Sequence, residues 1–266
     1  MSRTPPSVLT IAGSDSGGGA GIQADLRTFA AHHVHGLSVL TALTAQNTRG
    51  VSAIHAVPLR HVDAQLDAVF SDFRITAVKT GMLGTAALTR RVAEAMQTRR
   101  PRHLVVDPVM VASSGARLLR EDAVKAVRER LLPLASLITP NVPEAEVLLG
   151  RPLADRTDME AAAVSLHALG AGAVLLKGGH AEGRHVTDLL FDGERMLRFT
   201  QPRLRRDGHG TGCTLAAAVA ARLARGESLE DAVEGAIAFV HRALAAGFRP
   251  GRGRVCVLDT TACTPA

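Results

Sequence analysis

The stretch Asp207-Gly208-His209-Gly210-Thr211-Gly212-Cys213-Thr214 places three glycines directly before an apolar run over residues 215–224. Glycine lets the backbone turn into left-handed conformations and brings N–H groups close to a ligand, and the apolar run predicts a helix over residues 213–225. Unpaired amides at a helix N-terminus favour negative charge. We therefore predict an anion cradle made by Gly210, Thr211 and Gly212, suited to a transferring phosphoryl group.

Cys213 lies where the field of this predicted helix is strongest. A helix N-terminus lowers the pKa of a thiol, so Cys213 is expected to hold a substrate hydroxyl or to take its proton. The alternative is a small packing cysteine after a flexible turn. The dense glycines, His209 and the immediate helix start favour the functional reading.

The composition fits one large α/β domain over residues 1–266. A net charge of +6 could attract nucleic acid, but the arginines are scattered and the chain has no Trp or Tyr to stack bases. The charge is therefore read as attraction for anionic small molecules. Three cysteines without metal-binding spacing, no secretion signal and no membrane-length apolar run predict a protein of the reducing cytoplasm.

Strand and helix patterns alternate along the chain, which predicts a three-layer αβα fold with a mostly parallel sheet. Strands are expected at residues 8–12, 37–45, 51–57, 75–79, 104–107, 137–139 and 173–177, with an antiparallel edge hairpin at 186–191 and 195–200. Helices are expected at residues 22–32, 60–72, 85–99, 121–132, 157–169 and 229–246, and residues 249–254 and the tail are expected to be peripheral.

Polar residues follow several of these strands, at the edge where ligands bind in such folds. They are Gln46, Lys79, Asp107, Asn141, Glu144 and Lys177, with Gly81 and Met82 beside them. Lys79 and Lys177 are two of only three lysines in an arginine-rich chain, so they are expected to need a compact ammonium.

Four other features of the sequence give weaker evidence about function. The sequence from Gly19 to Ala24 imitates a dinucleotide-binding fingerprint, but the next strand ends in Gln46-Asn47 where that fold needs an acid. No P-loop motif occurs. The histidines at 32, 33 and 35 straddle a helix end and are expected to be surface residues, and Asp25 is either a surface carboxylate or aimed at a substrate hydroxyl.

Seven stretches together resemble the hydroxymethylpyrimidine and phosphomethylpyrimidine kinases of thiamine biosynthesis, within the ribokinase-like superfamily. They begin at Ala12-Gly-Ser-Asp-Ser-Gly-Gly-Gly-Ala-Gly-Ile-Gln-Ala-Asp25 and Thr44-Ala-Gln-Asn-Thr48, and continue with Lys79-Thr-Gly-Met-Leu83 and Val106-Asp-Pro-Val-Met110. The others are Thr139-Pro-Asn-Val-Pro-Glu-Ala145, Leu176-Lys-Gly-Gly-His180 and His209-Gly-Thr-Gly-Cys-Thr214. They span nearly the whole chain in family order.

The resemblance implies phosphate transfer from ATP to the hydroxymethyl group of an aminopyrimidine and then to its monophosphate, by a homodimer. It implies that Gln46 reads the ring edge, that Gly13 and Met82 shape the ring pocket and that Asp25 lies near the hydroxymethyl group. It further implies that Asp107 and Glu144 hold Mg²⁺ and that Asn141 and Lys177 lie near the ATP phosphates. The family usually has Asn-Thr where Asp207-Gly208 stands here.

Two other functions stay open at this point. A pyridoxal kinase of the same branch phosphorylates a ring that also carries a hydroxymethyl group. A vitamin-binding protein without activity would keep the ring pocket, but would have no need for Asp107, Glu144, Lys177 and the cradle.

Overall fold

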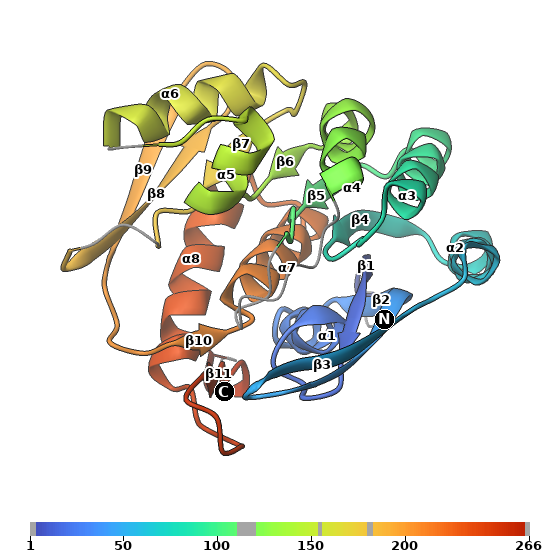
Figure 1. The fold of residues 1–266 in the computed structure, drawn as a ribbon, viewed down its shortest axis with the longest axis horizontal. Coiled ribbons are helices and arrows are strands. Elements are labelled where there is room, and N and C mark those ends of the chain that lie inside the picture. The colour runs from blue at the N-terminus through green and yellow to red at the C-terminus, as the bar shows by residue number, and fades with distance from the viewer. Residues whose placement is uncertain (1–3, 111–120, 154–155, 180–182, 264–266) are drawn as a thin grey trace.

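A nine-stranded sheet in the order β3-β2-β1-β4-β5-β6-β7-β8-β9 forms the centre of the molecule (Figure 1). The computed structural model describes residues 4–110, 121–153, 156–179 and 183–263, so His180 of the sixth motif lies outside the described residues. The strands are β1 (Ser7–Asp15), β2 (His35–Asn47), β3 (Gly50–Ala56), β4 (Ile75–Thr80), β5 (His103–Val106), β6 (Leu137–Ile138), β7 (Val174–Leu176), β8 (His185–Phe191) and β9 (Met196–Pro202).

The six neighbouring strands β2, β1, β4, β5, β6 and β7 run parallel to one another. The strands at the two edges, β3 on one side and β8 and β9 on the other, pair antiparallel. This confirms the mostly parallel sheet and the antiparallel edge hairpin that the sequence predicts. Parallel strands read as continuous apolar runs because both faces are covered. In β1, Val8 belongs to the core on one face, and Leu9 and Ile11 belong to the core on the other.

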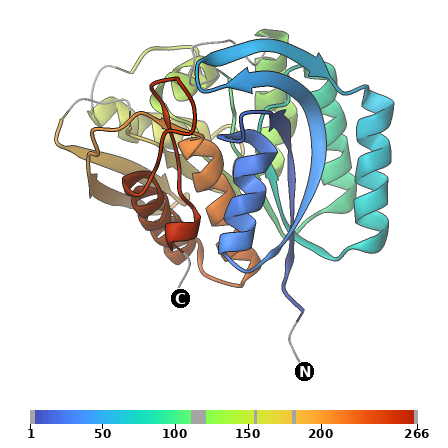
Figure 2. The same ribbon diagram turned by 90° about the horizontal axis from the view of Figure 1, so that it is seen from below.

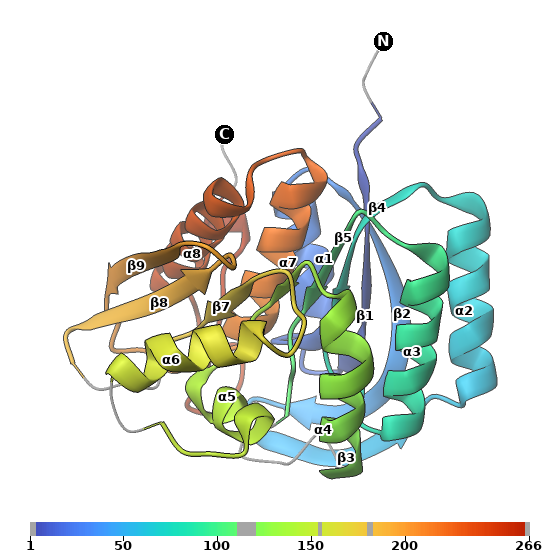
Figure 3. The ribbon, with the colours of Figure 1, turned by 90° about the horizontal axis from the view of Figure 1, so that it is seen from above.

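Helices cover both faces of the sheet (Figures 1 and 3). One layer contains α2 (Leu59–Asp72), α3 (Ala86–Arg99), α4 (Glu121–Ala126), α5 (Val142–Leu149) and α6 (Arg156–His167). The other contains α1 (Gly21–Ala31), α7 (Thr211–Ala224) and α8 (Leu229–Ala245). None of the helices in the described part of the chain combines the length and apolar character needed to cross a bilayer.

Helix α7 lies between the sheet, α1 and α8, and residues 216–221 have no solvent exposure. Five of these six residues are alanine, with Val219 as the exception. Small side chains all round a helix allow close packing on every side. The helix that carries the predicted cradle is therefore rigidly held by the core.

Two helical segments differ from the predicted pattern. The helix expected at 121–132 is shorter: α4 passes into a π-helical turn (Val127–Leu131) and a 3₁₀ turn (Leu132–Leu134). Pro133 has no N–H for a regular helix, which accounts for this ending. Helix α5 was not predicted, since it is one of the shortest and begins at a cap, Asn141, that the sequence suggested as a ligand group.

The segment 249–254 is mostly exposed, as the sequence predicted, but it is anchored to another part of the chain. The Gly253 N–H donates to Thr48 Oγ1 at 2.9 Å, so this segment packs on the turn between β2 and β3 (Figure 2). A Cβ at Gly253 would lie 2.0 Å from the Thr48 carbonyl oxygen, so only glycine fits there. Nearby, β10 (Gly208–His209) pairs in parallel with β11 (Cys256–Val257). The C-terminal segment thus supports both the β2–β3 ribbon and the start of α7.

Candidate active site

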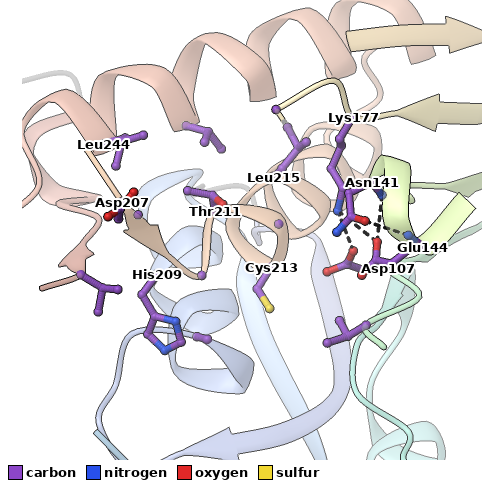
Figure 4. A pocket seen from close by; sticks show the side chains of 18 of the residues that line it. Asp107, Asn141, Glu144, Lys177, Asp207, His209, Thr211, Cys213, Leu215 and Leu244 are labelled. Atoms are coloured by element: carbon purple, nitrogen blue, oxygen red, sulfur yellow. Dashed lines mark hydrogen bonds and ion pairs between the residues drawn. The ribbon is translucent and has the colours of Figure 1, made fainter. Parts of the chain in front are cut away.

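A cleft of about 1120 Å³ opens along the carboxyl ends of the parallel strands. Asp25, Lys79 and Gly81 are not among its lining residues, but the other residues that the sequence proposes for the site are. They are Gly13, Gln46, Met82, Asp107, Asn141, Glu144, Lys177, Gly210, Thr211, Gly212 and Cys213. Figure 4 shows Cys213 between His209 on one side and the cluster of Asp107, Asn141, Glu144 and Lys177 on the other. The motifs therefore converge on one cleft with two different ends.

The N-terminus of α7 forms the middle of the cleft. Its N-cap Gly210 has φ 81° and provides no side-chain cap, so the first-turn amides are not covered by the chain's own capping group. A Cβ at Gly210 would lie 2.0 Å from the Gly19 carbonyl oxygen, which makes glycine necessary. Helix α7 starts at Thr211 rather than at the predicted Cys213, so Cys213 lies within the first turn.

The expected lowering of the Cys213 pKa is wrong for the ligand-free protein. Burial raises the pKa of this thiol from 9.0 to about 11. The positive charge of Lys79 and a hydrogen bond with the Gly21 backbone oppose the rise, and the carboxylates of Asp25 and Asp107 add to it. Desolvation and negative neighbours thus outweigh the helix terminus, and Cys213 is a neutral thiol near pH 7.

Asp25 lies beneath the cleft floor and not on its surface. Its carboxylate has no solvent exposure, accepts a hydrogen bond from Thr10 Oγ1 at 2.6 Å and pairs with Lys79 Nζ at 2.9 Å. Burial alone would lower the Lys79 pKa, but the Asp25 carboxylate raises it, so Lys79 stays charged. The structure therefore separates Asp25 from the residues that line the cleft, and gives Lys79 a buried partner that the sequence did not reveal.

Two carboxylates and a lysine form one end of the cleft. Lys177 Nζ lies 3.2 Å from Asp107 Oδ1 and 3.9 Å from Glu144 Oε2. Asn141 and Glu144 form a reciprocal capping box at the start of α5, with hydrogen bonds of 2.8 and 2.9 Å. This box fixes the Glu144 carboxylate beside Lys177.

The charges at this end are not balanced. Burial raises the pKa of Glu144 to about 6, Lys177 opposes the rise, and the repulsion from Asp107 adds to it. A cation would relieve that repulsion. Mg²⁺ commonly takes one or two protein carboxylates and completes its shell with substrate phosphates and water. Among the described residues, no group of three or more His, Cys, Asp or Glu side chains is placed to hold a metal ion. The two carboxylates of Asp107 and Glu144 are ligands of the type and number that Mg²⁺ takes when phosphates and water complete its shell.

Gly13, Gln46, Met82 and His209 line the opposite end of the cleft. A Cβ at Gly13 would lie 2.5 Å from Met82 Cε, so the absence of a side chain at Gly13 leaves room for Met82. Gln46 reaches in from β2, with its Nε2 atom 3.0 Å from His209 Nε2. His209 Nε2 also lies 2.9 Å from Asp15 Oδ2.

Asp15 organises the glycine-rich turn after β1, a role that the sequence analysis missed. It accepts hydrogen bonds from the amides of Gly17, Gly19 and Ala20 at 2.8 to 2.9 Å. Burial opposes ionisation, but the hydrogen bonds from His209 and the amides lower the pKa of Asp15. An Asp that precedes a turn with several glycines is a local signal that could have predicted this contact.

One wall of the cleft is apolar. Leu215 of α7 and three residues of α8, Ile237, Val240 and Leu244, line it together with Val186 of β8. No sequence motif marks these residues, because apolar positions on a helix also predict ordinary core packing.

Comparisons with known proteins agree with this arrangement. A family model described as "Phosphomethylpyrimidine kinase" matches residues 15–258. A hydroxymethylpyrimidine/phosphomethylpyrimidine kinase of Rhizobium meliloti is 52% identical over 253 residues, covering 93% of this chain and 95% of the relative. A thiamine biosynthesis bifunctional protein, ThiED, of Geobacter sulfurreducens is 54% identical over 248 residues, or 93% of this chain, but this chain spans only 51% of that relative.

A solved structure agrees in the fold. The ADP complex of Bacillus subtilis pyridoxal kinase has a TM-score of 0.90 and 36% identity, and covers 97% of this chain and 98% of its own. The architecture is ribokinase-like. From the family model and the identity over nearly the full length, the chain belongs to the phosphomethylpyrimidine kinase family.

Proposed function

We propose that this protein transfers the γ-phosphoryl group of ATP to the hydroxymethyl group of 4-amino-5-hydroxymethyl-2-methylpyrimidine, and then to the resulting monophosphate. One observation carries the proposal: the uncapped N-terminus of α7 and Cys213 lie between a ring-sized pocket and a cluster of Lys177 with two carboxylates (Figure 4). A kinase needs an acceptor, a cradle for the transferring phosphoryl group and charge neutralisation in that order.

Different residues of the cleft have different roles in the transfer of the phosphoryl group. The substrate oxygen forms a bond to the γ-phosphorus while the bond to the leaving ADP oxygen breaks. The first-turn amides of α7 stabilise the negative oxygens of the phosphoryl group, and Lys177 supplies a point charge near the phosphates, with Asn141 beside it. Mg²⁺ held by Asp107 and Glu144 would neutralise phosphate charge. The family match and the ADP complex of the solved neighbour support ATP as the donor.

Cys213 is proposed to orient the acceptor hydroxyl. Its neutral thiol can exchange hydrogen bonds with that hydroxyl, and the hydroxyl proton passes to an oxygen of the transferred phosphoryl group as the new P–O bond forms. Phosphoryl transfer through a loose transition state requires little proton removal before bond formation. A thiol whose pKa is raised to about 11 is therefore adequate for this task.

Gln46 is proposed to select the ring, with Gly13 and Met82 forming the pocket around it. A carboxamide can both donate to a ring nitrogen and accept from an amino group. A pocket that depends on such pairing discriminates against rings that leave it unpaired. Asp25 is proposed to act from below the floor, through Lys79, and not by touching the substrate.

Three further features belong to the proposal: one kinase domain over residues 1–266, a homodimer and a place in the cytoplasm. The single nine-stranded sheet supports one domain. The edge strand β3 has a largely exposed surface, with Ile54 at 48% exposure, which would suit contact with a second copy. Free Cys213 and Cys256 agree with a reducing compartment.

The deciding experiment measures ADP release with the aminopyrimidine alcohol, its monophosphate and pyridoxal in parallel. We expect the highest kcat/KM for the pyrimidine alcohol, and turnover of its monophosphate. A higher kcat/KM for pyridoxal would make the protein a pyridoxal kinase, the activity named for the solved neighbour. Ring binding without ADP release would make it a vitamin-binding protein.

A further inference from the structure

The side chains of Gln46 and His209 are in contact, and their hydrogen-bond partners determine which atoms donate and which accept. His209 Nε2 lies 2.9 Å from Asp15 Oδ2 and 3.0 Å from the atom of the Gln46 carboxamide that stands as Nε2. Asp15 accepts from three backbone amides, so its carboxylate is the acceptor of the His209 contact. His209 therefore carries its proton on Nε2, and it can only donate from that atom.

This protonation state determines which end of the Gln46 carboxamide faces His209. An NH₂ group there would put two donors 3.0 Å apart with no acceptor between them. Thr44 gives the same answer from the other end of the carboxamide, which lies 3.1 Å from Thr44 Oγ1. The single hydroxyl proton of Thr44 is used on the Ser14 carbonyl at the shorter distance of 2.8 Å, so Thr44 Oγ1 accepts from the carboxamide and the group facing it is the NH₂. The carboxamide oxygen and nitrogen have nearly the same shape, so the hydrogen-bond partners assign them.

We propose that His209 is a positioning residue for ring selectivity, because its Nε2–H, shared between Asp15 Oδ2 and Gln46, holds the carboxamide with its oxygen toward His209 and its NH₂ toward Thr44. In this orientation the second N–H and the second oxygen lone pair of Gln46 remain for a substrate. They match a ring that presents an acceptor nitrogen beside a donor amine, as an aminopyrimidine does. Pyridoxal presents a hydroxyl and an aldehyde oxygen instead. This inference rests on the proposed function.

The surroundings of His209 separate this role from support of the phosphate cradle. The backbone of His209 is held by pairing with Val257 in the β10–β11 sheet, and the Cys256 N–H donates to the Asp207 carbonyl at 2.8 Å. These contacts involve only backbone atoms, so they survive replacement of the His209 side chain. Gly19, where a Cβ would lie 2.2 Å from His209 Cδ2, leaves space for the ring. Loss of the imidazole should therefore affect KM for the ring more than kcat.

Two variants at this position test the inference. His209→Leu removes the donor, whereas His209→Gln places an N–H the same number of bonds from the backbone. We expect His209→Leu to raise KM for the pyrimidine alcohol about tenfold, the loss of roughly one hydrogen bond, with a much smaller change in kcat. The preference for pyrimidine over pyridoxal should fall, and His209→Gln should restore most of it. In a Gln46→Ala background, His209→Leu should have little further effect on this preference.

His32→Leu is the matched control. The expectation of a surface position is wrong for His32, which is buried like His209, and its Nδ1 lies 2.9 Å from the Thr28 carbonyl, away from the cleft. This variant should lower the thermal stability and leave the preference unchanged. An unchanged preference in His209→Leu, equal effects of the Leu and Gln variants, or full additivity with Gln46→Ala would each overturn the inference.

A measurement without turnover makes failure of this inference distinguishable from failure of the proposed function. In ¹⁵N-histidine-labelled protein, His209 should show a protonated Nε2, with the signal assigned by its loss in His209→Gln. The opposite tautomer would overturn the inference even if the pyrimidine is the substrate. The expected tautomer in a protein that does not phosphorylate the pyrimidine would leave the carboxamide orientation standing and remove the proposed function.

Discussion

Alkylation of Cys213 tests whether burial or the helix terminus controls this thiol. The pKa is raised from 9.0 to about 11, which lowers the thiolate fraction about 100-fold at pH 8. A more basic thiolate is also more nucleophilic, by about tenfold for this difference. The net expectation is that iodoacetamide modifies Cys213 about tenfold more slowly in the folded protein than in the chain unfolded by urea.

The assay follows each cysteine by mass spectrometry after timed alkylation between pH 7 and 9.5. The rate for folded Cys213 should rise about tenfold per pH unit over the whole range, without levelling near pH 9. Cys256, at 5% exposure, should remain largely unmodified and so report that the fold is intact. A folded-state rate that exceeds the unfolded rate, or that levels off below pH 8.5, would refute the burial argument and restore the helix terminus as the dominant influence.

Three further predictions concern the two ends of the cleft. Gln46→Ala should weaken binding of the pyrimidine alcohol by about 1 to 3 kcal/mol, seen as a higher KM, because polar groups of the ring lose their hydrogen-bond partner. An unchanged KM in steady-state assays would mean that other residues recognise the ring. Lys177→Arg should lower kcat although the charge is kept, since a planar guanidinium does not fit the compact position between Asp107 and Glu144; near-normal kcat would reduce Lys177 to a structural residue. Glu144 holds its proton more tightly when folded, so its contribution to stability is fully present below pH 4.5 and is lost as pH rises through about 6. Glu144→Gln should therefore raise the free energy of unfolding, measured by urea titration, by about 2 kcal/mol at pH 7.5 and by less at pH 5. The same variant should weaken Mg²⁺-dependent activity. Equal changes in the free energy of unfolding at both pH values would contradict this pH dependence.

The sequence predicted the sheet and most of the cleft because both depend on local patterns. Apolar runs such as residues 8–12 can only be buried strands in this alternation, and a residue at the end of a parallel strand, such as Asp107, necessarily reaches the same edge as Lys177. The outcome for Asp25 was different. Its position in the first turns of α1 is local information, but its burial depends on Lys79 from β4, which is 54 residues further along the chain.

The thiol of Cys213 shows the same limit. A helix N-terminus can be predicted from glycines, so its effect on a pKa can be predicted too. Desolvation and the carboxylates of Asp25 and Asp107 come from distant segments, and they reverse the result. Similarly, the contact of Gly253 with Thr48 joins residues 205 positions apart, and no composition of the C-terminal segment would have indicated it.

Because the middle of α7 is rich in alanine, the packing of this helix against the sheet determines the position of the catalytic groups at its N-terminus. Residues 216–221 set how closely the helix approaches the sheet, and the amides of Gly212 and Cys213 sit on the same rigid rod. A larger side chain at one of these alanines would lift that rod, and a shift of about 1 Å in a positioning group can cost a hundredfold in rate. Such a substitution can leave a folded protein with a poorly aligned phosphoryl acceptor. In this enzyme, a change of side-chain volume in the core under α7 therefore also changes the alignment of the reacting groups, so a core substitution that the fold tolerates can still lower the rate.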